Sequence, residues 1–263
     1  MKTVTINTLN ALKEKGEKFP VITAYDASFS RLIEQAGIEV ILVGDSLGNV
    51  IQGHDSTVPV TMDDMIYHIQ SVCRGNRQSL VIADMPFMAY ATEVQAMENA
   101  VLLMQAGANM VKLEGGAWLE ETVLMLTERG IPTCGHLGLT PQSVNKLGGY
   151  RVQGRDDEAA EQMIRDAHLL EDAGIDILVL ECVPSALAKQ ITEELHIPVI
   201  GIGAGPDTNA QVLVIYDMLG LSPRLPAFAK NFLAESGDVG SALKTYADEV
   251  RSGAFPKPEH GFT

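Results

Sequence analysis

The chain has 263 residues, of which 46% are apolar and 20% are charged, so it can form one large core or two small ones, and disorder is not expected. Its 19 basic and 34 acidic residues give a net charge of −15, which repels a polyanionic backbone and argues against nucleic-acid binding. No apolar run approaches the roughly 18 residues that cross a bilayer, and the N-terminal segment lacks the apolar block of a signal peptide, so we expect a cytoplasmic protein that does not enter a membrane.

The first predicted element is an amphipathic helix at residues 6–15, which either closes the bottom of a barrel or lies frayed on the surface. Short, mostly apolar runs follow, with helical segments between them. The runs are VITAY (21–25), VILVG (40–44), LVIAD (80–84), MVKLE (110–114), PTCGH (132–136), ILVLE (177–181), PVIGI (198–202) and VLVIY (212–216). Continuous apolar runs of this length are typical of strands covered on both faces, so the pattern predicts a parallel sheet.

A repeated Ala-Gly pair spaces these units. Gly37, Gly107 and Gly174 each follow a helical segment and lead into a strand, where glycine accepts the left-handed backbone that ends a helix. The copies lie about 70 residues apart, which leaves room for two strand–helix units in each interval. We therefore predict an α/β fold: a single-domain (β/α)8 TIM barrel over residues 1–263 with an extra N-terminal helix and C-terminal helices. An open, doubly wound sheet is the alternative.

Two segments between the predicted elements are too long for minimal turns. They span residues 46–61 and 137–155, and long loops where strands end usually cover a site. Residues 238–252 form the last predicted helix. The tail at 255–263 is either disordered or an oligomer contact.

Acidic residues stand where four of the predicted strands end. Asp45 follows the second run, and Asp84, Glu114 and Glu181 end the third, fourth and sixth. A single such acid could equally cap a helix or a turn, but strand ends in a parallel barrel converge on one face. Four carboxylates there repel one another, and a divalent cation relieves the repulsion. Because all candidate ligands are oxygens, Mg2+ is favoured over zinc or copper, with Asp45 and Asp84 as the natural pair.

Three further polar residues belong to the same predicted barrel mouth. Lys112 lies two residues before Glu114 and so shares its inward face, where it either forms a structural ion pair or binds a substrate carboxylate or oxyanion. His136 either donates a hydrogen bond or proton to substrate or is a satisfied polar group. Ser46 either binds a carboxylate oxygen or stabilises its turn.

The three cysteines, Cys73, Cys134 and Cys182, lie far apart and never in a CxxC spacing. Neither a disulfide framework nor a zinc cage is indicated by that spacing. We expect three buried thiols.

These residues suit an α-keto acid as substrate. A metal held by few protein oxygens keeps open positions for the carboxylate and ketone oxygens of the acid, and it stabilises the enolate that forms when a base removes the neighbouring proton. The enolate can be protonated, expel a leaving group or attack an electrophilic carbon. Composition and spacing do not choose among these fates.

Seven strings in one order resemble the ketopantoate hydroxymethyltransferase family. They are GDSLG (44–48), QGHDST (52–57), DMPFMAY (84–90), KLEGG (112–116), CGHLGLTPQ (134–142), LECVP (180–184) and GIGAG (201–205). The resemblance covers nearly the whole chain. It implies transfer of a hydroxymethyl group from 5,10-methylenetetrahydrofolate to 3-methyl-2-oxobutanoate through a Mg2+-stabilised enolate, giving 2-dehydropantoate in pantothenate and coenzyme A biosynthesis.

The same resemblance implies residue roles and an assembly. Asp45 and Asp84 would bind Mg2+, and Glu114 would complete the metal environment directly or through water. Glu181 would be the base that removes the C3 proton. The substrate site would be formed by Asp45, Ser46, Asp84, Lys112 and His136. A homodecamer of (β/α)8 barrels is also implied.

Two other functions remain open at this level. A Mg2+-dependent C–C lyase or phosphonomutase of the phosphoenolpyruvate/pyruvate barrel group would use the same enolate chemistry without folate. A noncatalytic barrel, acting as a ligand sensor or assembly subunit, would exchange no substrate protons. A folate with its glutamate tail is anionic, so this acidic chain would need a local basic rim, which Lys146, Arg151, Arg155 or Lys230 could supply.

Overall fold

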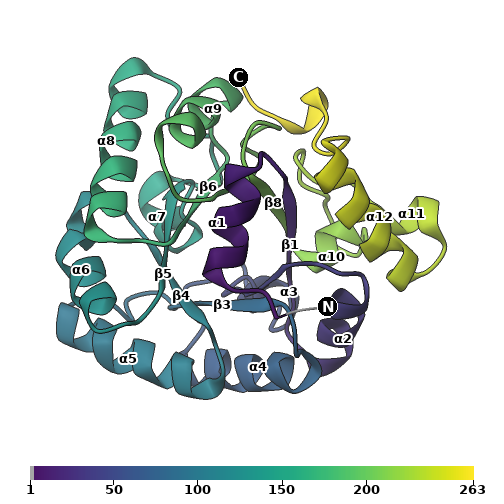
Figure 1. Ribbon diagram of the computed structural model, residues 1–263, viewed down its shortest axis with the longest axis horizontal. Helices are drawn as coiled ribbons and strands as arrows, with labels where there is room; N and C mark the ends of the chain where they lie inside the picture. Colours follow the sequence, from purple (N-terminus) through teal and green to yellow (C-terminus); the bar gives the residue numbers. More distant parts are fainter. Residues whose placement is uncertain (1–2) are drawn as a thin grey trace.

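The computed structural model describes residues 3–263, and its centre is a closed barrel of eight parallel strands (Figure 1). Each strand pairs with the next in chain order, and β8 closes the barrel by pairing with β1. The strands are β1 (Phe19–Thr23), β2 (Val40–Val43), β3 (Leu80–Asp84), β4 (Met110–Glu114), β5 (Thr133–Gly138), β6 (Ile177–Glu181), β7 (Val199–Ile202) and β8 (Ala210–Leu213). The predicted (β/α)8 barrel is confirmed, and the open-sheet alternative is wrong.

Helices surround the barrel and begin and end as the sequence indicates. Their bounds are α2 (Ala27–Gln35), α4 (Met62–Gly75), α5 (Glu93–Ala106), α6 (Glu120–Glu128), α8 (Asp157–Ala173), α9 (Ser185–Glu194), α10 (Ile215–Met218), α11 (Leu233–Ser236) and α12 (Val239–Ser252). Asp26, Thr61 and Asp156 accept hydrogen bonds from first-turn amides of α2, α4 and α8. Gly107 and Gly174 end α5 and α8 with φ of 118° and 102°, as the repeated pair predicts.

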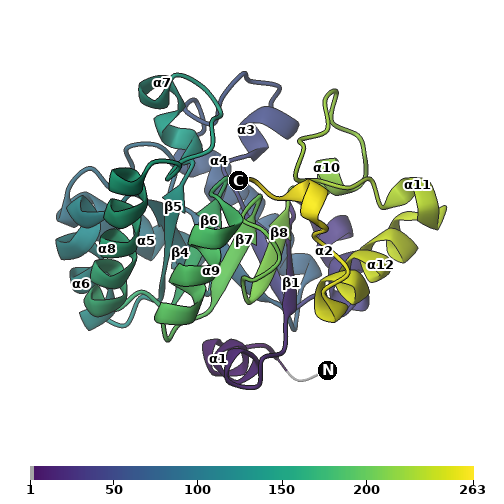
Figure 2. The same ribbon diagram turned by 90° about the horizontal axis from the view of Figure 1, so that it is seen from above.

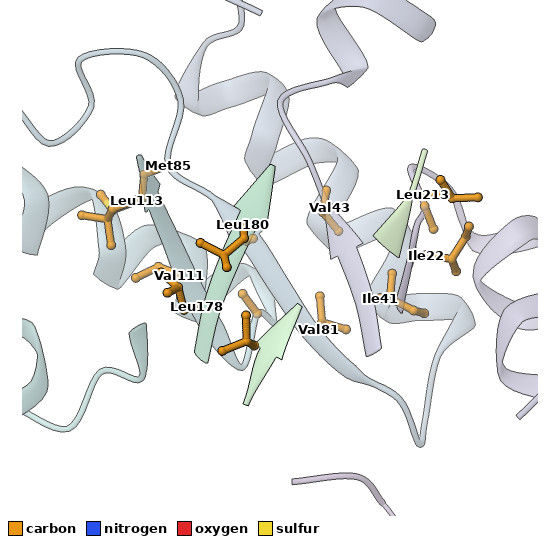
Figure 3. Packing of buried hydrophobic residues seen from close by; sticks show 14 of the residues in the cluster. Ile22, Ile41, Val43, Val81, Met85, Val111, Leu113, Leu178, Leu180 and Leu213 are labelled. Atoms are coloured by element: carbon orange, nitrogen blue, oxygen red, sulfur yellow. The ribbon is translucent and has the colours of Figure 1, made fainter. Parts of the chain in front are cut away.

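The barrel separates two apolar cores because side chains alternate along each strand. Val111 and Leu113 of β4 point outward into the layer between strands and helices, which Figure 3 shows. Met110 points inward and packs with Cys134 and other residues in the lower half of the barrel. Lys112 and Glu114 continue the inward row upward, so the register of β4 delivers polar side chains to the end where the strands finish.

Helix α1 (Ile6–Glu14) closes the opposite end of the barrel (Figure 2). Its Leu9 is fully buried and packs with the lower inward residues, among them Phe19 and Leu80. Lys13 Nζ donates to the main-chain oxygens of Thr192 (3.1 Å) and Ile197 (2.7 Å). The first of the two expectations for this segment, a plug at the bottom of the barrel, is therefore correct.

Both long loops lie over the end where the strands finish. The first contains the short helix α3 (Leu47–Val50), and the second contains η2 (Pro141–Ser143) and α7 (Val144–Leu147), all at the top of Figure 2. The tail packs on its own barrel: Ser185 N donates to the Phe262 main-chain oxygen (2.9 Å), and Phe255 is buried. Two other short turns are η1 (Ala117–Leu119) and η3 (Pro258–His260).

Two sequence expectations need adjustment. β8 ends at Leu213, because Ile215 and Tyr216 begin α10 and do not extend the strand. Cys134 and Cys182 are buried thiols, whereas Cys73 is half-buried on α4.

Across residues 3–263, no helix combines the length and the apolar character that crossing a membrane requires.

Candidate active site

A cavity of about 790 Å3 opens where the strands end, and all seven residues predicted for the metal, substrate and base sites line it. These are Asp45, Ser46, Asp84, Lys112, Glu114, His136 and Glu181. Both long loops contribute to its wall, through Asn49 and Asp55 on one side and Tyr150 and Arg151 on the other. The structure thus brings together side chains from five strand ends.

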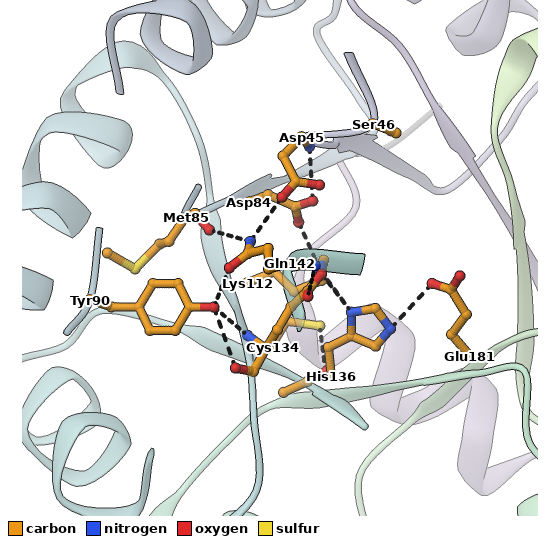
Figure 4. A network of polar contacts seen from close by, with 12 residues as sticks. Asp45, Ser46, Asp84, Met85, Tyr90, Lys112, Cys134, His136, Gln142 and Glu181 are labelled. Atoms are coloured by element: carbon orange, nitrogen blue, oxygen red, sulfur yellow. Dashed lines mark hydrogen bonds and ion pairs between the residues drawn. The ribbon is translucent and has the colours of Figure 1, made fainter. Parts of the chain in front are cut away.

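Strand register makes Lys112 the centre of this group. Residues Asp84 and Lys112 are direct cross-strand partners, as are Glu114 and His136. Lys112 Nζ lies 3.1 Å from Asp84 Oδ1, 3.5 Å from Glu114 Oε1 and 3.1 Å from His136 Nδ1 (Figure 4). Burial alone would lower the pKa of Lys112, but the charges of Asp84, Glu114 and Asp45 outweigh it and raise the pKa. The ammonium is therefore charged and already paired, while it still lines the cavity.

Gly44 explains how Asp45 reaches the same mouth although it lies one residue beyond the inward row of β2. A Cβ at Gly44 would lie 2.8 Å from Ser46 Oγ, so a larger residue at this position would displace the Ser46 hydroxyl. The Asp45 amide donates to Asp84 Oδ2 (3.0 Å), which fixes the two acids as neighbours. Burial, followed by the charges of Asp84 and Glu114, raises the pKa of Asp45 well above its usual value.

Glu114 is enclosed by donors. Its Oε1 lies 3.2 Å from His136 Nδ1, and its Oε2 accepts the Gln142 amide at 3.0 Å. Burial alone would raise the pKa of Glu114, but Lys112 and His136 hold it below its usual value. Burial and Lys112 would lower the pKa of His136, yet Glu114, together with hydrogen bonding to Glu181, raises it.

Glu181 differs from the other acids in its exposure. Its side chain is 15% exposed, against 5% for Asp84 and 2% for Glu114. Its Oε2 lies 3.4 Å from His136 Nε2. When His136 Nδ1 accepts from Lys112, the proton on Nε2 points toward Glu181. Glu181 is thus the acid of this group that most openly faces the cavity.

Sequence reasoning missed two residues of the network, Gln142 and Tyr90. Gln142 Nε2 donates to Asp45 Oδ2 (2.8 Å) and to the Met85 main-chain oxygen (2.9 Å), and its Oε1 accepts from the Tyr90 hydroxyl (2.5 Å). Both residues end strings quoted for the family resemblance, DMPFMAY and CGHLGLTPQ. Gln142 and Tyr90 lie on loops and are uncharged, so no strand periodicity or charge pattern in the sequence predicts that they belong to the site.

The donor set suits Mg2+ better than a metal that needs a full protein cage. Within residues 3–263 no group of three or more His, Cys, Asp or Glu is arranged to hold a metal. Asp45 and Asp84 offer two neighbouring carboxylates, which the Asp45 amide links by donating to Asp84 Oδ2. Mg2+ is commonly held by one or two carboxylates, with water and substrate oxygens completing its octahedron.

The basic rim differs from the one expected. Arg151 lines the cavity, but Lys230 pairs with Glu249 (2.8 Å) and Glu235 (3.2 Å), and Arg155 Nε donates to the Thr263 main-chain oxygen (3.3 Å). Arg224, on the segment after α10, also lines the cavity. Lys230 is therefore not one of the basic residues of the rim, because its salt bridges hold it elsewhere. The sequence does not reveal those salt bridges.

Comparison with known sequences gives one consistent result. The profile of the family described as ketopantoate hydroxymethyltransferase matches residues 3–258. The 3-methyl-2-oxobutanoate hydroxymethyltransferase of Cronobacter sakazakii is 60% identical over 263 residues, covering 100% of both chains. The protein of the same name from Erwinia tasmaniensis is 59% identical, again over 100% of both.

Solved structures resemble the fold at low sequence identity. Phosphonopyruvate hydrolase in complex with oxalate and Mg2+ has a TM-score of 0.62 and 14% identity, covering 98% of this chain and 93% of that chain. 2,3-Dimethylmalate lyase, described as a member of the PEP mutase/isocitrate lyase superfamily, has a TM-score of 0.56 and 16% identity, covering 79% and 80%. These similarities support the barrel architecture alone.

Proposed function

Because the chain belongs to the ketopantoate hydroxymethyltransferase family, we propose that it transfers a hydroxymethyl group to 3-methyl-2-oxobutanoate and produces 2-dehydropantoate for pantothenate biosynthesis. The one-carbon donor in this proposal is 5,10-methylenetetrahydrofolate. The observation that carries the proposal is the 59–60% identity to hydroxymethyltransferases over the full chain, joined to a cavity lined by the expected acids.

Asp45 and Asp84 are the proposed Mg2+ ligands. Bound there, Mg2+ would polarise the ketone of the substrate and stabilise negative charge on its oxygen. Glu114 Oε1 already accepts from Lys112 Nζ (3.5 Å) and its Oε2 accepts the Gln142 amide, so we assign Glu114 to the surroundings of the ion, acting through water. The structure of phosphonopyruvate hydrolase in complex with oxalate and Mg2+, which has a similar barrel, supports a small dicarbonyl ligand on this fold.

Lys112 and Ser46 are proposed to hold the carboxylate of the keto acid. Lys112 keeps its ammonium charged at the cavity wall, and the Ser46 hydroxyl lies 2.8 Å from the Tyr25 hydroxyl, which fixes its position. His136 lies between Glu114 and Glu181, with its Nε2 3.4 Å from Glu181 Oε2, and it lines the same cavity. Of the two possibilities for His136, we propose that it donates a hydrogen bond to the substrate.

Glu181 is the proposed base that removes the C3 proton. It is the most open of the buried acids, and Asp45, Asp84 and Glu114 are each engaged by other groups. A base must reach its proton within hydrogen-bond distance, directly or through one water, and a carboxylate facing the cavity satisfies that condition. The resulting carbon nucleophile then attacks the one-carbon unit of the donor.

The outer part of the cavity is the proposed folate site. A cavity of about 790 Å3 is far larger than a five-carbon acid needs, and its wall includes Tyr216, Phe228 and Phe262. Aromatic side chains of this kind suit a planar pterin ring. Arg151 and Arg224 on the same wall suit the carboxylates of a glutamate tail.

Deuterium exchange tests this assignment without folate. With Mg2+ in deuterated water, the protein should incorporate deuterium at C3 of 3-methyl-2-oxobutanoate, and Glu181→Gln should slow this by at least about 100-fold while keeping Mg2+ affinity. Glu193→Gln, an exposed acid on α9, is the matched control and should exchange at the native rate. Native exchange by Glu181→Gln would show that another group is the base.

Product formation separates the proposal from its rivals. Addition of methylenetetrahydrofolate should give 2-dehydropantoate. Turnover of a 2-hydroxydicarboxylate in its absence, without hydroxymethyl transfer, would identify a C–C lyase. No exchange at all would favour a noncatalytic barrel.

We further propose, on the family resemblance, that residues 1–263 form one domain, that the protein acts in the cytoplasm and that it assembles as a homodecamer. Light scattering on the purified protein measures its mass directly. Ten times the 28.3 kDa chain mass is the expected value.

A further inference from the structure

Gln142 connects three strand ends of the active site from a loop that follows a fourth strand. It lies in η2, on the long loop after β5. Its side-chain amide reaches Asp45 at the end of β2 and the Met85 main chain just after β3, and its backbone amide reaches Glu114 at the end of β4. Gln142 is only 5% exposed, so these hydrogen bonds are made away from bulk water.

The orientation of the Gln142 amide is fixed by its partners. Nε2 faces two acceptors, Asp45 Oδ2 (2.8 Å) and the Met85 main-chain oxygen (2.9 Å), whereas Oε1 faces the Tyr90 hydroxyl (2.5 Å). A flipped amide would place its oxygen against both acceptors. Tyr90 is itself held, because its hydroxyl accepts the Glu114 amide (3.2 Å) and its ring stacks on Trp118 at 5.8 Å.

We propose that Gln142 is a positioning residue for the metal site: it holds Asp45 by Oδ2 and so presents Oδ1 toward the cavity, and Tyr90 keeps the Gln142 amide in the orientation that does this. Among the described residues, no hydrogen bond reaches Asp45 Oδ1. Partners that orient metal ligands commonly change metal affinity 10- to 100-fold when they are removed. This inference rests on the proposed role of Asp45 as a Mg2+ ligand.

Calorimetric titration with Mg2+ alone tests the inference. Gln142→Met keeps the length of the side chain but removes both hydrogen-bonding groups, and it should raise the Mg2+ Kd about 10- to 100-fold. Gln190→Met is the matched control, because Gln190 is exposed on α9 and its side-chain amide bonds to Glu194. It should bind Mg2+ as the wild type does.

Tyr90→Phe is the second variant, and it tests whether the Tyr90 hydroxyl holds the Gln142 amide. Removing only the hydroxyl should raise the Kd by a smaller factor than Gln142→Met. The double variant should bind no more weakly than Gln142→Met alone, because Tyr90 acts through Gln142. A purely structural role for these residues would lower the melting temperature without changing Mg2+ affinity.

The outcomes separate this inference from the proposed function. Wild-type affinity in folded Gln142→Met overturns the inference and leaves the metal site intact. If Gln142→Met does not fold, Tyr90→Phe decides: a weakened Kd supports the inference and a wild-type Kd overturns it. If the wild type binds no Mg2+, the proposed metal site fails first, and the positioning role fails with it.

Discussion

At the scale of single residues, the site is a network in which one buried lysine is shared by two buried acids. Lys112 contacts both Asp84 and Glu114, and all three side chains are at most 5% exposed. A buried ion pair contributes little net stability, but removing one partner leaves an uncompensated charge at a cost of about 3–5 kcal/mol. The stability of the mouth therefore depends strongly on the one buried cation.

Lys112→Met should consequently lower the free energy of unfolding by about 3–5 kcal/mol, because Asp84 and Glu114 lose their common partner. Added Mg2+ should restore part of the loss, since a bound cation supplies the missing positive charge. Urea unfolding with and without Mg2+ measures both effects. Lys189→Met, which breaks an exposed pair 4.0 Å long, should change stability by less than about 1 kcal/mol. Equal effects of the two substitutions would refute the argument.

The sequence predicted the charged residues of this network but not its neutral residues, Gln142 and Tyr90. Asp84, Glu114 and Glu181 stand at the ends of apolar runs, where a strand delivers its side chain to a known face. Gln142 reaches Asp45 across 97 positions of sequence, through a loop whose path no periodicity constrains. The family strings contain Gln142, but only coordinates show what it touches.

At the scale of elements, the strands were predictable because each is buried on both faces and therefore apolar throughout. The same rule misplaced the end of β8. Residues 212–216 form one apolar run, but Val214 is the N-cap of α10, and apolar character does not distinguish a strand from the buried turn of helix that follows it. Residues 6–15 were predicted to form either a plug under the barrel or a frayed surface helix. These two possibilities differ only in their tertiary contacts, which the sequence does not show.

A substitution in helix α1 measures how much this plug contributes to the stability of the barrel. Leu9→Ala should lower the free energy of unfolding by about 2–5 kcal/mol, because Leu9 is fully buried under the lower layer of the barrel. Leu124→Ala, on the exposed face of α6, should cost much less. Urea melts give the stabilities, and deuterium exchange at saturating substrate should stay native in folded Leu9→Ala, since α1 lies at the far end of the barrel from the cavity. A stability equal to the wild type would mean that α1 is not anchored by Leu9.

At the scale of the whole molecule, the barrel concentrates charge where it is most costly. The chain carries a net charge of −15, and Asp45, Asp84 and Glu114 share one buried mouth with a single lysine. The raised pKa of Asp45 expresses this cost, because burial comes first among its causes and the neighbouring acids follow. A fold selected for stability alone would avoid such an arrangement, whereas a cation site requires it.

Asp45→Asn should therefore stabilise the metal-free protein while removing its response to metal. In EDTA, loss of the buried negative charge should raise the free energy of unfolding by about 1–2 kcal/mol. In the wild type, Mg2+ at 100 times its Kd should add about 2.7 kcal/mol, and the variant should show almost none of this gain. Asp172→Asn, an exposed acid on α8, should behave as the wild type in both conditions. Thermal and urea unfolding measure the differences. If Asp45→Asn were less stable than the wild type in EDTA, the carboxylate would be part of what holds the metal-free barrel together, and the proposed trade between stability and metal binding would be wrong.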